Sequence, residues 1–269
     1  MEKNTLNNSQ YKTDENLNAR ALIHEKYSTN KTPWHKWVFK AILLEGHKNI
    51  LELGCGNGLL WIKNADIIPG TWNMTLTDYS DGMLQAAKEN LKDINMEVEY
   101  KNVNVENIPY GNETFDCIIT NHMLYHVDNR IKALNEIGRV LHRDGFFYAS
   151  TAGMKHMHEM KKMVNDFLGN TRYEEVISDV ENNFSLENGK EQLLEVFDKV
   201  DLLKYDDSLE INEPELIVNY VLSFNDIKPG VIVLDPSRKD NFYAFIAKQI
   251  KKEKTIRIQK HMGLFICRK

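Results

Sequence analysis

Ile50-Leu51-Glu52-Leu53-Gly54-Cys55-Gly56-Asn57-Gly58 is the stretch that decides the fold of this chain. Its first four residues form a short, mostly apolar run that is typical of a buried strand. The glycines at 54, 56 and 58 predict a turn with unusual backbone dihedral angles, which a ligand can approach closely. A helix from about Leu59 to Ala65 follows, and it starts with free N–H groups. This order is typical of a nucleotide-binding α/β sheet.

Strands and helices alternate along the rest of the chain. We predict helices at 17–27, 34–44, 81–93 and 129–141, and strands at 74–77, 96–103, 115–121 and 146–151. Beyond Gly153 the pattern predicts helices over 154–199, a strand at 200–211, helices near 213–224 and 240–252, and two short strands at 255–259 and 264–268. Such alternation favours a parallel sheet with right-handed crossovers.

Asp78 ends the second predicted strand, twenty residues after Gly58. A carboxylate at this place accepts the ribose hydroxyls of a bound nucleotide. The alternative is that Asp78 caps the next helix, although Ser80 or Asp81 can take that role. Leu59 stands where the dinucleotide fingerprint G-x-G-x-x-G needs a glycine, which disfavours an NAD dehydrogenase.

Glu52 completes the pattern E-x-G-x-G-x-G, which resembles motif I of the class I S-adenosylmethionine (SAM) dependent methyltransferases. Four later segments resemble that family's acidic loop, its D-A-E-x-L-P-F segment, its fourth strand with the following loop, and its L-x-P-G-G turn: 77–84, 104–110, 115–126 and 141–146. The resemblance covers about residues 48–152. Asn104 departs from the usual Asp, and Asp144-Gly145 from Pro-Gly-Gly.

The resemblance implies an α/β, Rossmann-like class I methyltransferase sheet, mostly parallel with an antiparallel C-terminal strand. We divide the chain into an N-terminal helical lid (1–47), a SAM-binding core (48–152), a helical cap insertion (153–199) and the C-terminal part of the core sheet (200–269). The implied cofactor is SAM, and its product is S-adenosylhomocysteine.

Roles follow from the resemblance, residue by residue. Glu52 receives hydrogen bonds near the methionine amino group, or only ties down the glycine turn. Asp78 takes the ribose, Met83 packs on adenine or is plain core, and the amide oxygen of Asn104 accepts from the adenine amino group. The cofactor-binding residues expected in this way are Glu52, Gly54, Cys55, Gly56, Asn57, Gly58, Asp78, Tyr79, Met83, Asn104, Val105, Glu106, Asn121, His122, Arg20 and Tyr27.

The acceptor side is less well defined by the sequence. His126 lies five residues past a strand end and is a candidate general base, or else an ordinary loop histidine. Arg20, His24 and Tyr27 share one helix face. The resemblance implies an N-terminal helical lid over the cofactor, from which Arg20 or Tyr27 would reach the methionine end of SAM; the alternative is an ordinary exposed helix face. Residues 121–124 read Asn-His-Met-Leu and lack the prolines of [DN]-P-P-[YF], which disfavours nucleic-acid bases and glutamine as acceptors.

Composition narrows the class of protein. The formal charge of −5 argues against a nucleic-acid surface, and three cysteines without CxxC spacing give neither a disulfide framework nor a zinc site. His156 and His158 point apart on a helix, so we expect no metal. We predict a cytoplasmic enzyme, monomeric or homodimeric and without membrane or nucleic-acid partners, that methylates an O, N or C nucleophile of a small metabolite. The alternatives are a non-catalytic SAM-binding sensor or scaffold and a protein or RNA methyltransferase.

Overall fold

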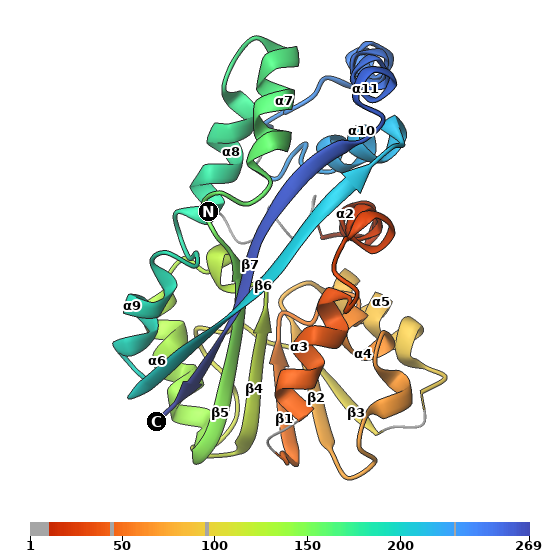
Figure 1. The fold of residues 1–269 in the computed structure, drawn as a ribbon. Coiled ribbons are helices and arrows are strands. Elements are labelled where there is room, and N and C mark those ends of the chain that lie inside the picture. Colours follow the sequence, from red (N-terminus) through yellow and green to blue (C-terminus); the bar gives the residue numbers. More distant parts are fainter. Residues whose placement is uncertain (1–10, 44–45, 95–96, 229) are drawn as a thin grey trace. The chain divides into compact units, whose positions relative to one another are not determined.

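The computed structural model describes residues 11–43, 46–94, 97–228 and 230–269 (Figure 1). The first ten residues of the predicted lid lie outside this description, as do Leu44 and Met96, where a predicted helix ends and a predicted strand begins. The described residues form two compact units. We call 34–154, 181–205 and 262–269 the sheet unit, and 11–33, 155–180 and 206–261 the helical unit.

One seven-stranded sheet has the order β3-β2-β1-β4-β5-β7-β6. The strands are β1 (Asn49–Leu53), β2 (Asn73–Asp78), β3 (Val98–Asn102), β4 (Phe115–Asn121), β5 (Leu141–Ala152), β6 (Lys199–Ile211) and β7 (Ile256–Arg268). Neighbours from β3 to β5 pair in parallel, and β7 pairs with β5 antiparallel. This confirms the predicted fold class. The order reverses between β1 and β4, which is where ligands bind in open α/β sheets.

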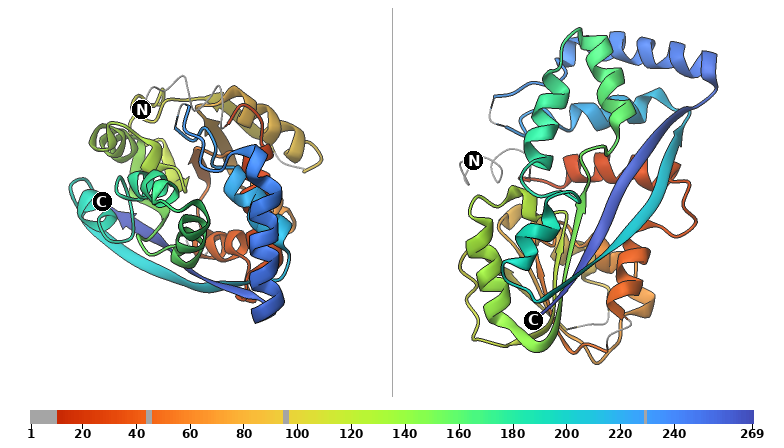
Figure 2. Two further views of the ribbon diagram at one scale, coloured as in Figure 1. Left: turned by 90° about the horizontal axis from the view of Figure 1, so that it is seen from above. Right: turned by 60° about the vertical axis from the view of Figure 1, so that its left-hand side comes forward.

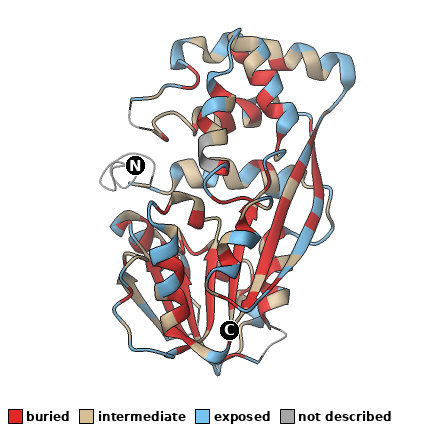
Figure 3. Ribbon diagram, turned by 90° about the vertical axis from the view of Figure 1, so that its left-hand side faces the viewer, coloured by how far each residue is buried: buried red, intermediate tan, exposed pale blue. Residues whose placement is uncertain are grey.

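Helices cover both faces of the sheet unit, as the views in Figure 2 show for the orange α3 and the yellow-green α6. These helices are α3 (Trp34–Leu43), α4 (Leu59–Ile62), α5 (Asp81–Leu91), α6 (Arg130–Val140) and α9 (Gly189–Leu194). Leu51 and Leu53 of β1 pack into one apolar cluster and Ile50 into the other. Because successive strand residues face opposite sides, β1 is buried on both faces. Figure 3 shows that buried residues, in red, predominate in the strands of the sheet.

The helical unit has its own core. It contains α2 (Glu15–Tyr27), α7 (His158–Leu168), α10 (Pro214–Leu222), α11 (Lys239–Glu253) and most of α8 (Arg172–Glu181). Ile23, Met160 and Met163 are buried among apolar residues of these helices. None of the helices in the described part of the chain is long and apolar enough to span a bilayer.

The two units divide the chain differently from the predicted segments. The predicted lid is split after Pro33, and most of the predicted cap (155–180) groups with the helical unit while its remainder groups with the sheet unit. The reason is packing: α2 buries Ile23 in the helical core, whereas α3 buries Val38 and Phe39 in the core of the sheet unit.

Two strands differ from the prediction by more than two residues. The sequence predicts that β5 begins at 146, but it begins at Leu141, directly after α6. Leu141 is fully buried and pairs with Phe115. The next pair is Cys117 with Phe146, so residues 142–145 of β5 form an irregular stretch opposite a single residue of β4. The two short strands predicted at 255–259 and 264–268 are one strand, β7. Residues 262–267 of β7 pair continuously with β5, and Lys260, inside the strand, has a buried partner for its charge.

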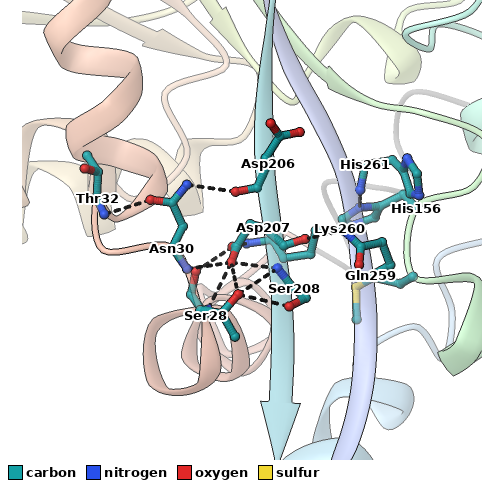
Figure 4. Close-up of polar contacts among 12 residues, drawn as sticks. Ser28, Asn30, Thr32, His156, Asp206, Asp207, Ser208, Gln259, Lys260 and His261 are labelled. Atoms are coloured by element: carbon teal, nitrogen blue, oxygen red, sulfur yellow. Dashed lines mark hydrogen bonds and ion pairs between the residues drawn. The ribbon is translucent and has the colours of Figure 1, made fainter.

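That partner is Asp207 on β6, shown in Figure 4. Lys260 Nζ lies 2.6 Å from Asp207 Oδ2, and both side chains are buried. The carboxylate also accepts hydrogen bonds from Ser28 Oγ (2.5 Å) and from the N–H of Thr29 (3.0 Å) and Asn30 (2.9 Å). Burial raises the pKa of Asp207, but the bonds from Lys260 and Ser28 outweigh it and hold the pKa below its usual value. Asp207 thus fastens the segment after α2 to β6.

Replacing Asp207 with Asn should lower the free energy of unfolding by about 3–5 kcal/mol, because it leaves the buried Lys260 ammonium without its counter-charge. Denaturant unfolding measures this. Asp206→Asn, at the exposed neighbouring position, is the control and should change stability by under about 0.5 kcal/mol. Equal losses in the free energy of unfolding for the two variants would contradict the assignment of Asp207 as the buried counter-charge of Lys260.

Candidate functional site

The glycine turn after β1 has the conformation that the sequence predicts. Gly54, Gly56 and Gly58 have φ values of +76°, +56° and +82°, which side-chain-bearing residues rarely adopt. The end of β2 holds this turn, because the N–H groups of Gly54 and Cys55 both donate to the carbonyl oxygen of Thr77 at 2.8 Å. The Thr77 hydroxyl donates in turn to the carbonyl oxygen of Glu52 at 2.8 Å. The following helix, α4, is shorter than predicted and ends at Ile62.

Asp78 lies at the carboxyl end of β2 and reaches back to the turn. Its Oδ2 accepts from the N–H of Gly56 at 2.9 Å, and its Oδ1 accepts from the N–H of Ser80 at 2.8 Å. Ser80 caps α5, so Asp78 is free of that alternative role. Burial raises the pKa of Asp78 above its usual value, and the hydrogen bonds from the N–H groups of Ser80 and Gly56 offset this rise in part. Each carboxylate oxygen keeps acceptor capacity for a hydroxyl ligand.

Glu52 is a second carboxylate on β1, and it is almost completely buried. Trp61 donates its indole N–H to Glu52 Oε2 at 2.5 Å. The pKa of Glu52 is raised to about 8 in total. Burial is the largest cause, the charge of Asp78 adds to the rise, and the hydrogen bond from Trp61 opposes it. No described residue forms an ion pair with Glu52. A buried carboxylate of this kind is a natural partner for the cation of a ligand.

The other residues predicted around the turn differ in exposure. Cys55, Asn57 and Met83 are buried, and Met83 belongs to the apolar stripe of α5. Burial raises the pKa of the Cys55 thiol well above its usual value. Tyr79 is 40% exposed.

The segment after β3 is joined to β2, since the N–H of Val103 donates to the carbonyl oxygen of Asp78 at 3.2 Å. Asn104 Oδ1 accepts from the N–H of Glu106 at 3.1 Å, which leaves it a second acceptor site. Val105 packs against one core cluster, and Glu106 Oε1 accepts from the N–H of Asn129 at 3.5 Å.

The carboxyl end of β4 carries Asn121 and His122, which were predicted to bind the cofactor, and His126, the predicted acceptor-side residue, follows it. Asn121 Oδ1 accepts from the Ser150 hydroxyl at 2.5 Å, and the N–H of His122 donates to the same hydroxyl at 3.0 Å. His122 has φ +53°, and its ring centroid lies 5.3 Å from that of Trp34. The ring of His126 lies edge-on to Tyr125, with centroids 4.5 Å apart. His122, Tyr125 and His126 follow the end of β4, and Trp34 is contributed by α3.

Arg20 and Tyr27 lie in the helical unit. The Arg20 guanidinium stands 5.1 Å from the ring centroid of Phe224, and the Tyr27 hydroxyl donates to Asn212 Oδ1 at 2.7 Å. Burial, with a contribution from Glu213, raises the pKa of Tyr27 to about 12. Their role toward the cofactor stays a prediction.

The described residues contain no group of three metal-ligating side chains. His156 has a structural contact, because its Nδ1 accepts from the N–H of His261 at 3.2 Å (Figure 4).

Three residues that shape this site were not singled out from the sequence: Trp61, Thr77 and Met123. Trp61 and Thr77 form the hydrogen bonds described above. Met123 lies against the turn, since a Cβ added to Gly54 would stand 2.5 Å from Met123 Cγ. Only Thr77 carries a local signal, its place directly before Asp78. The contact of Met123 depends on the pairing of β1 with β4.

Gly54→Ala should lower the free energy of unfolding by about 1–3 kcal/mol more than Gly46→Ala, as measured by denaturant unfolding. Gly46 also has a positive φ, +65°, but a Cβ added there would meet nothing within 4 Å, so it controls for backbone strain. Equal losses would show that Met123 does not crowd the turn.

Glu52→Gln should stabilise the protein increasingly as the pH rises. The pKa of Glu52 is about 8 in the folded chain and 4.5 for the free side chain, so folding retains a proton that the unfolded chain loses. Stability of the wild type therefore falls between about pH 4.5 and pH 8, and Gln removes this loss. Urea unfolding at several pH values measures the difference. The exposed Glu97→Gln is the control, and a difference that does not vary with pH would contradict the account.

Comparison with known proteins agrees with this geometry. Residues 51–149 match a family model described as a methyltransferase domain. The ubiquinone/menaquinone biosynthesis C-methyltransferase UbiE of Klebsiella pneumoniae is 32% identical over 114 residues, which are 42% of this chain and 45% of that protein. The chain thus matches less than half the length of such curated relatives.

Two solved structures have a similar fold. Phosphoethanolamine N-methyltransferase 2 of Haemonchus contortus is 17% identical with a TM-score of 0.60, over 99% of this chain and 59% of that chain. The [4+2]-cyclase SpnF is 16% identical with a TM-score of 0.59, over 99% and 96%. At these identities the similarity shows the fold alone. The family match and the ordered motifs go further for one segment, because they support a class I SAM-dependent methyltransferase domain at residues 51–149.

Proposed function

We propose that this chain binds SAM at the turn 54–58 and transfers its methyl group to a small-molecule acceptor. The observation that carries the proposal is the bond between Asp78 and the N–H of Gly56, which fixes an acidic side chain beside a ligand-accessible glycine turn. The position of this pair at the reversal of strand order supports the proposal.

The residues present fit the proposed cofactor. The two carboxylates offer acceptors of different kinds: Asp78 for the ribose hydroxyls and the buried Glu52 for the ammonium group. Asn104 offers an amide oxygen for the adenine amino group. SAM supplies a methyl group activated by a sulfonium, so the protein's contribution is mainly binding and orientation.

The acceptor is proposed to lie at the end of β4. Asn121 and His122 are fixed there by Ser150, and His126 is oriented by its contact with Tyr125. In this proposal His126 takes the proton of the acceptor nucleophile.

A small acceptor is favoured over a macromolecule by the acidic balance of the chain, since nucleic-acid binding needs clustered Lys and Arg. The nucleophile is an O, N or C atom. UbiE is named as a C-methyltransferase and the Haemonchus contortus enzyme as an N-methyltransferase, and the match to UbiE covers less than half of each chain.

A second candidate is a SAM-binding protein that transfers no methyl group. This candidate is favoured by the similarity in fold to SpnF, which is named as a [4+2]-cyclase. One fold supports different chemistries.

Asp78→Asn should weaken the binding of S-adenosylhomocysteine at least about tenfold, because an amide replaces one of the charged acceptors. Isothermal titration calorimetry measures this. Asp81→Asn, at an exposed position in the first turn of α5, should leave the affinity unchanged. Equal affinities of wild type and Asp78→Asn would remove Asp78 from the site.

Methyl transfer itself is tested with methyl-labelled SAM and separate pools of small metabolites, protein and RNA. The proposal expects label in the small-metabolite pool. Label in the protein or RNA pool would overturn the small-molecule acceptor. Binding of S-adenosylhomocysteine without transfer to any pool would support the second candidate instead.

A further inference from the structure

Trp61 lies close to the glycine turn 54–58 in the sequence and in the structure. It lies three residues after Gly58, and its backbone N–H donates to the carbonyl oxygen of Gly58 at 3.0 Å. Its side chain is fully buried, and its indole N–H points at Glu52 Oε2, 2.5 Å away. A side chain of α4, the first helix after the turn, thus donates a hydrogen bond to a side chain of β1, the strand before the turn.

Neighbouring aromatic rings fix the direction of this donor. The ring of Phe39 lies edge-on to Trp61 with a centroid distance of 6.1 Å, and that of Trp72 does so at 6.5 Å. All three side chains belong to one buried apolar cluster of the sheet unit. In such a packed cluster the indole cannot turn away from Glu52 without displacing its neighbours.

The other oxygen of Glu52, Oε1, receives no hydrogen bond from a described residue. The titratable groups that act on Glu52 or are acted on by it are Asp78 on β2, Cys55 in the turn and Cys117 on β4. Each of them is acidic. The charged form of Glu52 therefore has one neutral donor, Trp61, and lacks a cation among the described residues.

We propose that Trp61 is a positioning residue of the cofactor site, whose indole N–H favours the carboxylate form of Glu52 and leaves Oε1 for the ammonium group of the cofactor. This inference rests on the proposed function. Trp61 does not touch the cofactor itself; it acts through Glu52.

The proposal couples cofactor binding to a proton. With a pKa of about 8, Glu52 is largely protonated at neutral pH in the absence of ligand. Pairing with an ammonium requires the carboxylate, so binding near pH 7 releases a proton from Glu52. Removing the Trp61 donor favours the protonated form of Glu52 further. At every pH at which Glu52 is protonated in the free protein, the affinity for the cofactor then falls, because Glu52 must lose its proton on binding.

The test measures the affinity for S-adenosylhomocysteine from about pH 6 to pH 9.5 in wild type, Trp61→Phe and Trp72→Phe. Trp61→Phe should bind about tenfold more weakly near pH 7, and the ratio should approach one near pH 9.5. Trp72→Phe removes an indole N–H from the same cluster and should show no pH-dependent loss. A loss in Trp61→Phe that is the same at every pH, or that Trp72→Phe shares, would overturn the proposal.

A second measurement needs no change at Trp61. Calorimetry of S-adenosylhomocysteine binding at pH 7, in buffers of different ionisation enthalpy, should show proton release in the wild type and none in Glu52→Gln. Binding by the wild type without proton release would overturn the proposal and leave the proposed function standing. Failure of the wild type to bind SAM or S-adenosylhomocysteine would overturn the proposed function.

Discussion

The hydrogen bonds between the end of β2 and the glycine turn 54–58 are the constraint on which the rest of the site depends. Thr77 accepts two turn N–H groups through its carbonyl oxygen, and Asp78 accepts a third through its carboxylate. Without these bonds the three glycines would have wide conformational freedom, because they lack a Cβ. With them, the end of β1 is fixed to the end of β2. The conformational cost of ordering a ligand-binding turn is met by folding, before any ligand arrives.

The same arrangement concentrates negative charge at one edge of the sheet. Glu52 and Asp78 each have a pKa raised by burial, and each adds to the cost of ionising its neighbours. Hydrogen bonds from the turn, from Ser80 and from Trp61 relieve this cost only in part. A ligand with ribose hydroxyls and a cation satisfies both carboxylates together. This favours SAM over a dinucleotide, in agreement with Leu59 at the place of the third fingerprint glycine.

The parts of the site that follow from local sequence were predictable. Glycines in a turn, an acid at a strand end and the bounds of β4 depend on neighbours in the chain, and the structure has them as expected. Contacts between distant segments were not predictable. The bond from Trp61 to Glu52 and the ion pair of Asp207 with Lys260 arise only once strands and helices are packed. The pairing of residues 262–267 of β7 with β5 is likewise a long-range contact, and it runs through part of the gap between the two predicted short strands.

The most direct test of the central claim is amide hydrogen exchange, measured by mass spectrometry with and without S-adenosylhomocysteine. The account expects ligand-dependent slowing in peptides that cover residues 52–58 and 78–83, with no comparable effect of NADH. Slowing confined to other segments, or slowing of these peptides by NADH alone, would show that the glycine turn and Asp78 do not form a site for SAM.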